Sequence, residues 1–116
     1  MELVKHSQPL EFKYEDIVFL VKKHANAEDK MEVALSGKRD GNDIFWTRAE
    51  YCKTIIRRMV LGWKGVTQDG KEVPYSFDAL CELPHVEGRN VFLALGEFVM
   101  EHTDIRNSKA KDLKNA

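Results

Sequence analysis

The stretch "WTRAEYCKTIIRRMVLGW", which begins at Trp46, constrains the fold more than any other part of the chain. Thr47 with Glu50 three residues later predicts a capping box at a helix N-terminus, and Trp46 with Tyr51 predicts the accompanying hydrophobic staple. We therefore predict a central core helix over residues 48–64. The apolar side chains of its inward stripe are Cys52, Ile55, Ile56, Met59, Val60 and Trp63.

The segment after Asn26 predicts a second helix. Asn26 is a favourable N-cap, and Glu28 and Asp29 in the first turn would suit the helix dipole. Gly37 stands where a glycine is expected just past a helix end. The face expected to point inward carries Ala27, Met31, Ala34 and Leu35.

Two more helices are expected in the C-terminal part. "SFDALCEL" predicts a short helix that is capped by Ser76 or Asp78 and ended by Pro84. A last helix is expected over residues 87–102, where Gly96 would permit another helix to approach closely. The side chains expected to face inward from these two helices are Phe77, Leu80, Cys81, Val91, Phe92, Leu95, Phe98, Val99 and His102.

The N-terminal part is ambiguous between strand and helix. "LEFKYE" alternates apolar and charged residues and predicts a short strand. "DIVFLVKKH" fits a buried strand as well as a helical face, and we favour the helix. The expected fold is therefore mainly α: a single small helical domain with a short β-hairpin-like loop at about residues 66–74 and room for one N-terminal strand.

Length and charge limit the classes of function. A chain of 116 residues is one domain, expected over residues 1–105, with a flexible basic tail over residues 106–116. The formal net charge of −1 gives no reason to expect nucleic acid or an anionic membrane as partner. No apolar run approaches ~20 residues and no secretory signal is visible, so we expect a cytosolic protein that is not secreted and has no membrane partner.

The stretch "GWKGVTQDGKEVPYS" holds a near-match to a phosphate-binding loop. Gly65, Gly70 and Lys71 have the required spacing, but Glu72 replaces the hydroxyl residue that would hold Mg²⁺. The segment also follows a helix instead of a buried strand. We interpret it as a structural joint that consists of a helix stop, an Asp-Gly turn and a helix restart.

No catalytic or metal site is expected. Cys81 and His85 lie four residues apart and Cys52 is the second cysteine, yet the paired spacings of a structural zinc site are missing. We expect both cysteines to be buried small hydrophobic residues. No serine stands in a nucleophile elbow. The sequence therefore predicts a protein that is not an enzyme and that has no cofactor.

A basic set of side chains lies on the predicted core helix. Arg48, Lys53, Arg57 and Arg58 could cross a DNA backbone, but no recognition helix follows within three or four residues. We do not expect nucleic-acid binding. The alternative function that we keep open is a small helical regulatory or nucleic-acid-associated module, which would act through the basic face of the helix over residues 48–64 and through the C-terminal tail.

One pattern in the chain is familiar. It consists of Trp63, Gly65, Val66, Asp69, Gly70, Val73, Pro74, Tyr75, Ser76 and Leu80. A helix, a Trp-x-Gly-Val, a D-G-(K)-x-(V)-P-(Y/F)-S segment and a short helix that ends near proline follow one another in the same order in small phage tail assembly chaperones of long-tailed siphophages. The chain resembles that family over roughly residues 47–100.

The resemblance implies a non-enzymatic, phage-encoded protein of the host cytoplasm. Such chaperones bind the tape measure protein, keep its helices soluble, recruit tail tube protein subunits and self-associate. Recognition would place amphipathic client helices against apolar stripes or a groove. Candidate partner-binding side chains are the aromatic residues outside the two clear stripes and two arginines that could meet acidic client segments. They are Phe12, Tyr14, Phe45, Trp46, Tyr75, Arg57 and Arg58.

Overall fold

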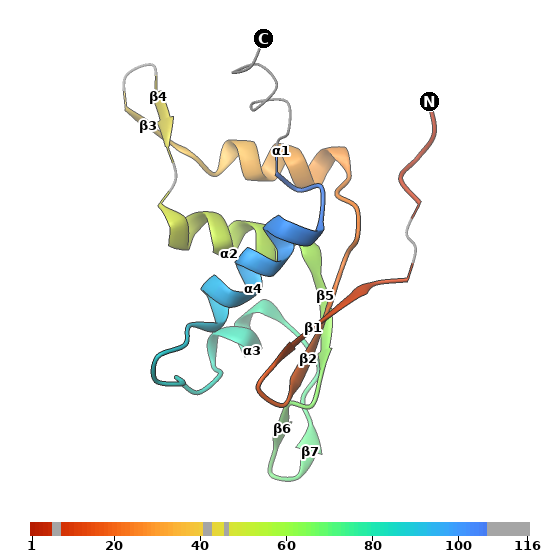
Figure 1. Ribbon diagram of the computed structural model, residues 1–116, viewed down its shortest axis with the longest axis vertical. Helices are drawn as coiled ribbons and strands as arrows, with labels where there is room; N and C mark the ends of the chain where they lie inside the picture. The colour runs from red at the N-terminus through yellow and green to blue at the C-terminus, as the bar shows by residue number, and fades with distance from the viewer. Residues whose placement is uncertain (6–7, 41–42, 46, 107–116) are drawn as a thin grey trace.

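A three-stranded antiparallel sheet packs against helices in the computed structural model of the protein (Figure 1). The structure describes residues 1–5, 8–40, 43–45 and 47–106, and for 38–40 and 43–45 it describes the backbone alone. It is 40% helix and 22% strand, so the predicted mainly α fold is wrong and the fold is mixed α/β. The predicted tail beyond residue 106 lies outside the described residues.

Helices and strands are interspersed along the chain. In chain order they are β1 (Leu10–Tyr14), β2 (Ile17–Val21), α1 (Ala27–Leu35), β3 (Lys38–Asp40), β4 (Asp43–Phe45), α2 (Arg48–Met59), β5 (Val60–Lys64), β6 (Thr67–Gln68), β7 (Lys71–Glu72), α3 (Phe77–Cys81) and α4 (Val91–His102). The β3–β4 and β6–β7 hairpins project from opposite ends of the molecule in Figure 1.

Strand β2 is the centre of the sheet, between β1 and β5. Phe19 pairs with Phe12 of β1 on one side and with Trp63 of β5 on the other. The preference for a helix over Ile17–Val21 is therefore wrong. Five consecutive apolar residues satisfy both periodicities, and the neighbouring strands on both sides favour the extended form, in which Ile17, Phe19 and Val21 are buried on one face.

Helix α2 begins where the sequence predicts and ends five residues early. The N–H of Glu50 donates a hydrogen bond to the Thr47 hydroxyl at 3.2 Å, which confirms Thr47 as the N-cap. The helix stops at Met59, because the next five residues pair with β2 as strand β5. The predicted staple through Trp46 lies outside the described residues.

Helix α1 starts at the predicted cap but turns the opposite face to the core. Asn26 and Asp29 form a reciprocal capping box. The buried side chains are Asp29 and Val33, so the prediction of the inward face is wrong. The predicted inward residues are all exposed: Ala27, Met31, Ala34 and Leu35. Burying a carboxylate needs compensating partners, and Lys22 and Arg58 supply them.

Helix α3 carries a cap that the sequence suggests, while α4 begins later than predicted, at a cap that was not predicted. Ser76 caps α3 by accepting a hydrogen bond from the N–H of Ala79 at 3.0 Å. Cys81 is exposed, so its predicted inward position is wrong. Helix α4 begins at Val91 and not at residue 87, because the Asn90 side chain caps it there by accepting from two backbone N–H groups.

The core lies between the inner face of the sheet and the helices α2 and α4 (Figure 1). It is formed by large apolar side chains from every layer, together with Leu80 of α3 and Ile105 after α4. Its fully buried members are Phe19, Val21, Cys52, Ile55, Ile56, Met59, Leu80, Leu95, Val99 and Ile105. This core positions α1 and the residues that join β5 to α3.

Gly96 lets α4 approach α2, as the sequence suggests, and replacing it with alanine is expected to lower the free energy of unfolding by about 1–3 kcal/mol. The added Cβ would lie 2.5 Å from Sγ and 2.8 Å from Cβ of Cys52. This clash outweighs the ~1 kcal/mol that alanine gains over glycine within a helix. Urea denaturation followed by circular dichroism measures the change.

A double substitution separates the clash from other effects of the alanine. In a Cys52→Ala background the sulfur is gone, so Gly96→Ala should cost less there than in the native background. An equal cost in both backgrounds would assign the clash to the Cβ of residue 52, which the alanine keeps, and not to the sulfur. A gain in stability from Gly96→Ala alone would show that the α2–α4 approach does not depend on this glycine.

Candidate functional site

Residues 63–80 connect β5 to α3, and we call this segment the joint. Gly65 has a φ of 94°, and an added Cβ there would collide with the carbonyl oxygen of Asp16, so the chain needs glycine at this point. Asp69 and Gly70 both have positive φ and close the β6–β7 hairpin, as the sequence predicts. The N–H of Val73 then donates to the carbonyl oxygen of Val66 at 2.9 Å.

Trp63 holds the two arms of the joint together. Its indole N–H donates a hydrogen bond of 2.7 Å to the carbonyl oxygen of Val73. The ring of Tyr75 meets the indole edge-on, with ring centroids 5.1 Å apart. Burial raises the pKa of Tyr75 to about 12, and the neighbouring Cys81 adds to this rise. Trp63, Val73 and Tyr75 thus pack together at the base of the joint, which follows a strand and not the predicted helix.

The other predicted aromatic residues occupy separate places. The Phe12 ring stacks on Phe98 of α4, with centroids 4.8 Å apart. Tyr14 is buried, and the guanidinium carbon of Arg89 lies 4.6 Å from the centroid of its ring. The backbone of Phe45 lies in β4, but its side chain lies outside the described part, as does all of Trp46. Phe12, Tyr14 and Tyr75 therefore all make contacts within the fold.

The two predicted arginines lie together beside a groove between α1 and α2. Arg57 is exposed, and its guanidinium lies 4.3 Å from the centroid of the Phe77 ring. The guanidinium of Arg58 points towards α1, where it binds Asp29 at 3.0 Å and Glu28 at 3.6 Å. The groove has a volume of about 350 Å³ and is lined by Glu32, Leu35, Ser36, Thr54, Arg57 and Arg58.

A buried carboxylate fixes one wall of this groove. Asp29 accepts hydrogen bonds from Lys22 at 2.7 Å, from the N–H of Asn26 at 3.0 Å and from Arg58 at 3.0 Å. Burial raises the pKa of Asp29, but these three hydrogen bonds outweigh burial and hold its pKa below the ordinary value of 3.8. Asp29 is therefore ionised near neutral pH and fastens α1 to α2.

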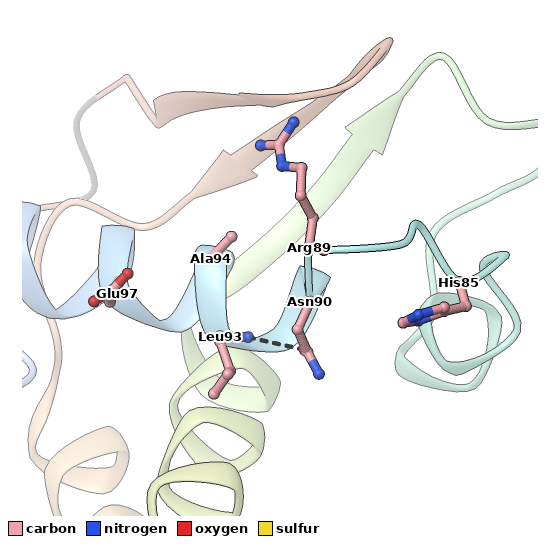
Figure 2. Close-up of a pocket in the computed structure, with 7 residues that line it drawn as sticks. His85, Arg89, Asn90, Leu93, Ala94 and Glu97 are labelled. Atoms are coloured by element: carbon pink, nitrogen blue, oxygen red, sulfur yellow. Dashed lines mark hydrogen bonds between the residues drawn. The ribbon is translucent and has the colours of Figure 1, made fainter.

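A second hollow lies at the start of α4, and three of its polar side chains, Arg89, Asn90 and Glu97, already have partners (Figure 2). Asn90 caps the helix, and Glu97 binds Arg48 at 2.7 Å. Arg89 points towards the sheet, where it binds Glu15 at 2.7 Å. The hollow also includes His85, Gly88, Leu93 and Ala94. Its charged side chains stabilise the fold from their present positions.

Sequence reasoning missed Met31 and Leu35 as surface residues. They are 61% and 72% exposed, which is high for large apolar side chains. No local signal in the sequence reveals them, because Lys22 and Arg58, which lie outside α1, hold Asp29 and with it Val33 on the buried face. The same turn of the helix then places Met31 and Leu35 outside.

Within the described ranges, no group of three or more His, Cys, Asp or Glu side chains is arranged to hold a metal ion. In the same part of the chain, no helix is long and apolar enough to cross a bilayer. Comparison of the chain with protein-family models, with curated proteins and with solved structures gave no match.

Proposed function

We propose that the protein is a tail assembly chaperone of a long-tailed phage. In this role it binds the tape measure protein in the host cytoplasm, keeps its amphipathic helices soluble, helps to recruit tail tube subunits and self-associates. The proposal assigns no chemical reaction to the chain. It makes the exposed surfaces of the helices, and not an enclosed pocket, the functional part of the molecule.

The joint is the observation that carries the proposal. The residues through which the chain resembles these chaperones are the ones that build the joint: Trp63 and Val73 share a hydrogen bond, Gly65 permits the close approach to Asp16, and Ser76 caps α3. A pattern with such contacts specifies a local fold. Proteins that share the pattern are expected to share this strand–hairpin–helix arrangement.

The exposed apolar side chains of α1 support the same function. A chaperone for helices needs apolar surface that is free before the client arrives. Met31 and Leu35 provide such surface next to the α1–α2 groove.

The nucleic-acid alternative has less support from the basic face of α2. Two of the four basic side chains on which it relies are paired with carboxylates, since Arg48 binds Glu97 and Arg58 binds Asp29. Pairing lowers the positive potential that a phosphate backbone would meet. A binding titration with duplex DNA at low salt tests this alternative directly.

Co-expression with the tape measure protein from the same phage genome tests the proposed function. We expect the soluble fraction of the tape measure protein to rise several-fold when this chain is present, and the two to co-purify. A tape measure protein that stays equally insoluble with and without the chain would refute the proposal. An unrelated small protein expressed at the same level is the control for general effects of expression.

A further inference from the structure

Strand β1 forms one edge of the three-stranded sheet, with β2 as its neighbour on one side only. The tight turn after Tyr14 makes Tyr14 and Ile17 a hydrogen-bonded pair. Such pairs alternate along an antiparallel ladder, so the backbone N–H and C=O groups of Glu11 and Lys13 point away from β2. Within the described part of the chain, no other backbone group forms a hydrogen bond with them.

The side chains of β1 alternate between the core and solvent. Phe12 lies opposite Phe19 on the inner face of the sheet, where its ring stacks on Phe98 of α4. Glu11 and Lys13 therefore lie on the outer face, and both are exposed. Neither side chain forms an ion pair with another described residue. The edge thus presents one carboxylate and one ammonium group, at the same two positions whose backbone groups point outward.

This edge is complementary in charge to a second copy of itself. Two antiparallel copies of β1 align along their whole length when Phe12 of one lies opposite Phe12 of the other. Glu11 of each copy then lies opposite Lys13 of the other, where they can exchange two backbone hydrogen bonds and form an ion pair. A shift by two residues, the smallest that keeps the same face outward, would place Glu11 opposite Glu11 or Lys13 opposite Lys13. Charge therefore selects one register.

The other edge of the sheet, β5, lacks this pattern. Its one charged residue is Lys64, so a second copy would bring no opposite charge to it. Strand β5 also follows α2 directly, and its register against β2 shifts between Leu20 and Val21. Residues 1–5, which precede β1, run away from the β1–β2 hairpin in Figure 1. Of the two edges, β1 is the one that fits a second copy.

We propose that two copies of the chain associate through β1, which joins their sheets into one antiparallel sheet about a two-fold axis at Phe12. Pro9 before the strand has no N–H to donate, and Glu15 after it turns the chain with a φ of 54°. The pairing is therefore short, and we expect a weak dimer that forms as the protein concentration rises. The inference rests on the proposed function in that it assigns a surface to self-association, but its test needs no client protein.

Charge-reversal variants test the register. Glu11→Lys would set cations opposite one another and Lys13→Glu would set carboxylates opposite one another, so each should weaken the dimer about tenfold. An equimolar mixture of the two variants should associate again, because every facing pair then has opposite charges. The doubly exchanged chain, Glu11→Lys with Lys13→Glu, should associate by itself for the same reason. Analytical ultracentrifugation over a series of concentrations at low salt measures each affinity.

Two control variants make the same changes of charge elsewhere. Glu72→Lys and Lys71→Glu alter exposed residues of β7 and should leave the affinity of the dimer within about twofold. Glu11→Pro removes an outward N–H without removing a hydrogen bond to β2, so it should also weaken the dimer about tenfold if the backbones pair. Circular dichroism confirms that each variant is folded.

The outcomes separate this inference from the proposed function. A native chain that stays monomeric up to about 1 mM would overturn the inference. Native affinity in Glu11→Lys and Lys13→Glu, or a mixture of the two that stays monomeric, would overturn it as well. A tape measure protein that monomeric Glu11→Lys still makes soluble would leave the proposed function intact. Conversely, the charge-exchange results would sustain the β1 interface even if co-expression shows that the tape measure protein is not the client.

Discussion

Replacing Trp63 with alanine is expected to lower the free energy of unfolding by about 3–5 kcal/mol, the range for truncating a large buried aromatic side chain. Trp63 is 9% exposed and lies against Phe19 of the central strand, with ring centroids 6.1 Å apart. It also stacks edge-on with Tyr75 and donates the hydrogen bond to Val73. The substitution removes all three contacts, and with them the link between β5 and α3.

Two further variants show which part of the tryptophan matters. Trp63→Phe keeps a ring but leaves the Val73 carbonyl without its indole donor, so we expect an intermediate loss of about 1–3 kcal/mol. Lys64→Ala changes the exposed neighbour on the same strand and should cost under about 0.5 kcal/mol. Urea denaturation gives all three values. A loss below about 1 kcal/mol for Trp63→Ala would mean that the joint does not depend on this side chain.

Replacing Asp29 with alanine is expected to lower the free energy of unfolding by about 2–4 kcal/mol. The Asp29 side chain is fully buried, while its partners Lys22 and Arg58 keep 14% and 29% of their side chains exposed. The loss should therefore be smaller than for a wholly buried pair, because both cations can recover some water. Glu28→Gln is the matched control, since Glu28 also contacts Arg58 but is 73% exposed and should change stability little.

The pH dependence of stability gives an independent check on Asp29. Its pKa in the folded protein is below the ordinary value, so its contribution is present above the unfolded-state pKa and is lost as pH falls through the folded pKa. The stability difference between the native protein and Asp29→Asn should hence be constant near neutral pH and shrink below about pH 4. A difference that stays constant down to pH 2 would show that Asp29 is not held ionised by its partners.

The helix starts could be predicted from sequence because caps are local. Thr47, Ser76 and Asn26 each bond to a backbone N–H three residues along, and no distant segment has to be known. The end of α2 depends on distant residues instead. Val60 and Trp63 continue the helical stripe, but they also pair with Val21 and Phe19 of β2, and that pairing decides the outcome.

The candidate surface was predictable only in part for a similar reason. Arg57 and Arg58 are polar and were expected outside the stripe of α2, where they lie. Met31 and Leu35 were expected inside, because an apolar side chain is normally the one that a helix buries. The ion pair between Arg58 of α2 and Asp29 overrides that preference, because it holds the Asp29 face of α1 against the core and leaves the opposite face exposed.

The soluble fraction of the tape measure protein, measured in parallel with the native chain and with two of its variants, tests the central claim most directly. The claim predicts a several-fold rise with the native chain and with Lys71→Glu, and little or no rise with Arg57→Glu, whose folded state is verified beforehand. No rise with the native chain would contradict the proposed function. A full rise with Arg57→Glu would contradict the prediction that Arg57 is a partner-binding residue.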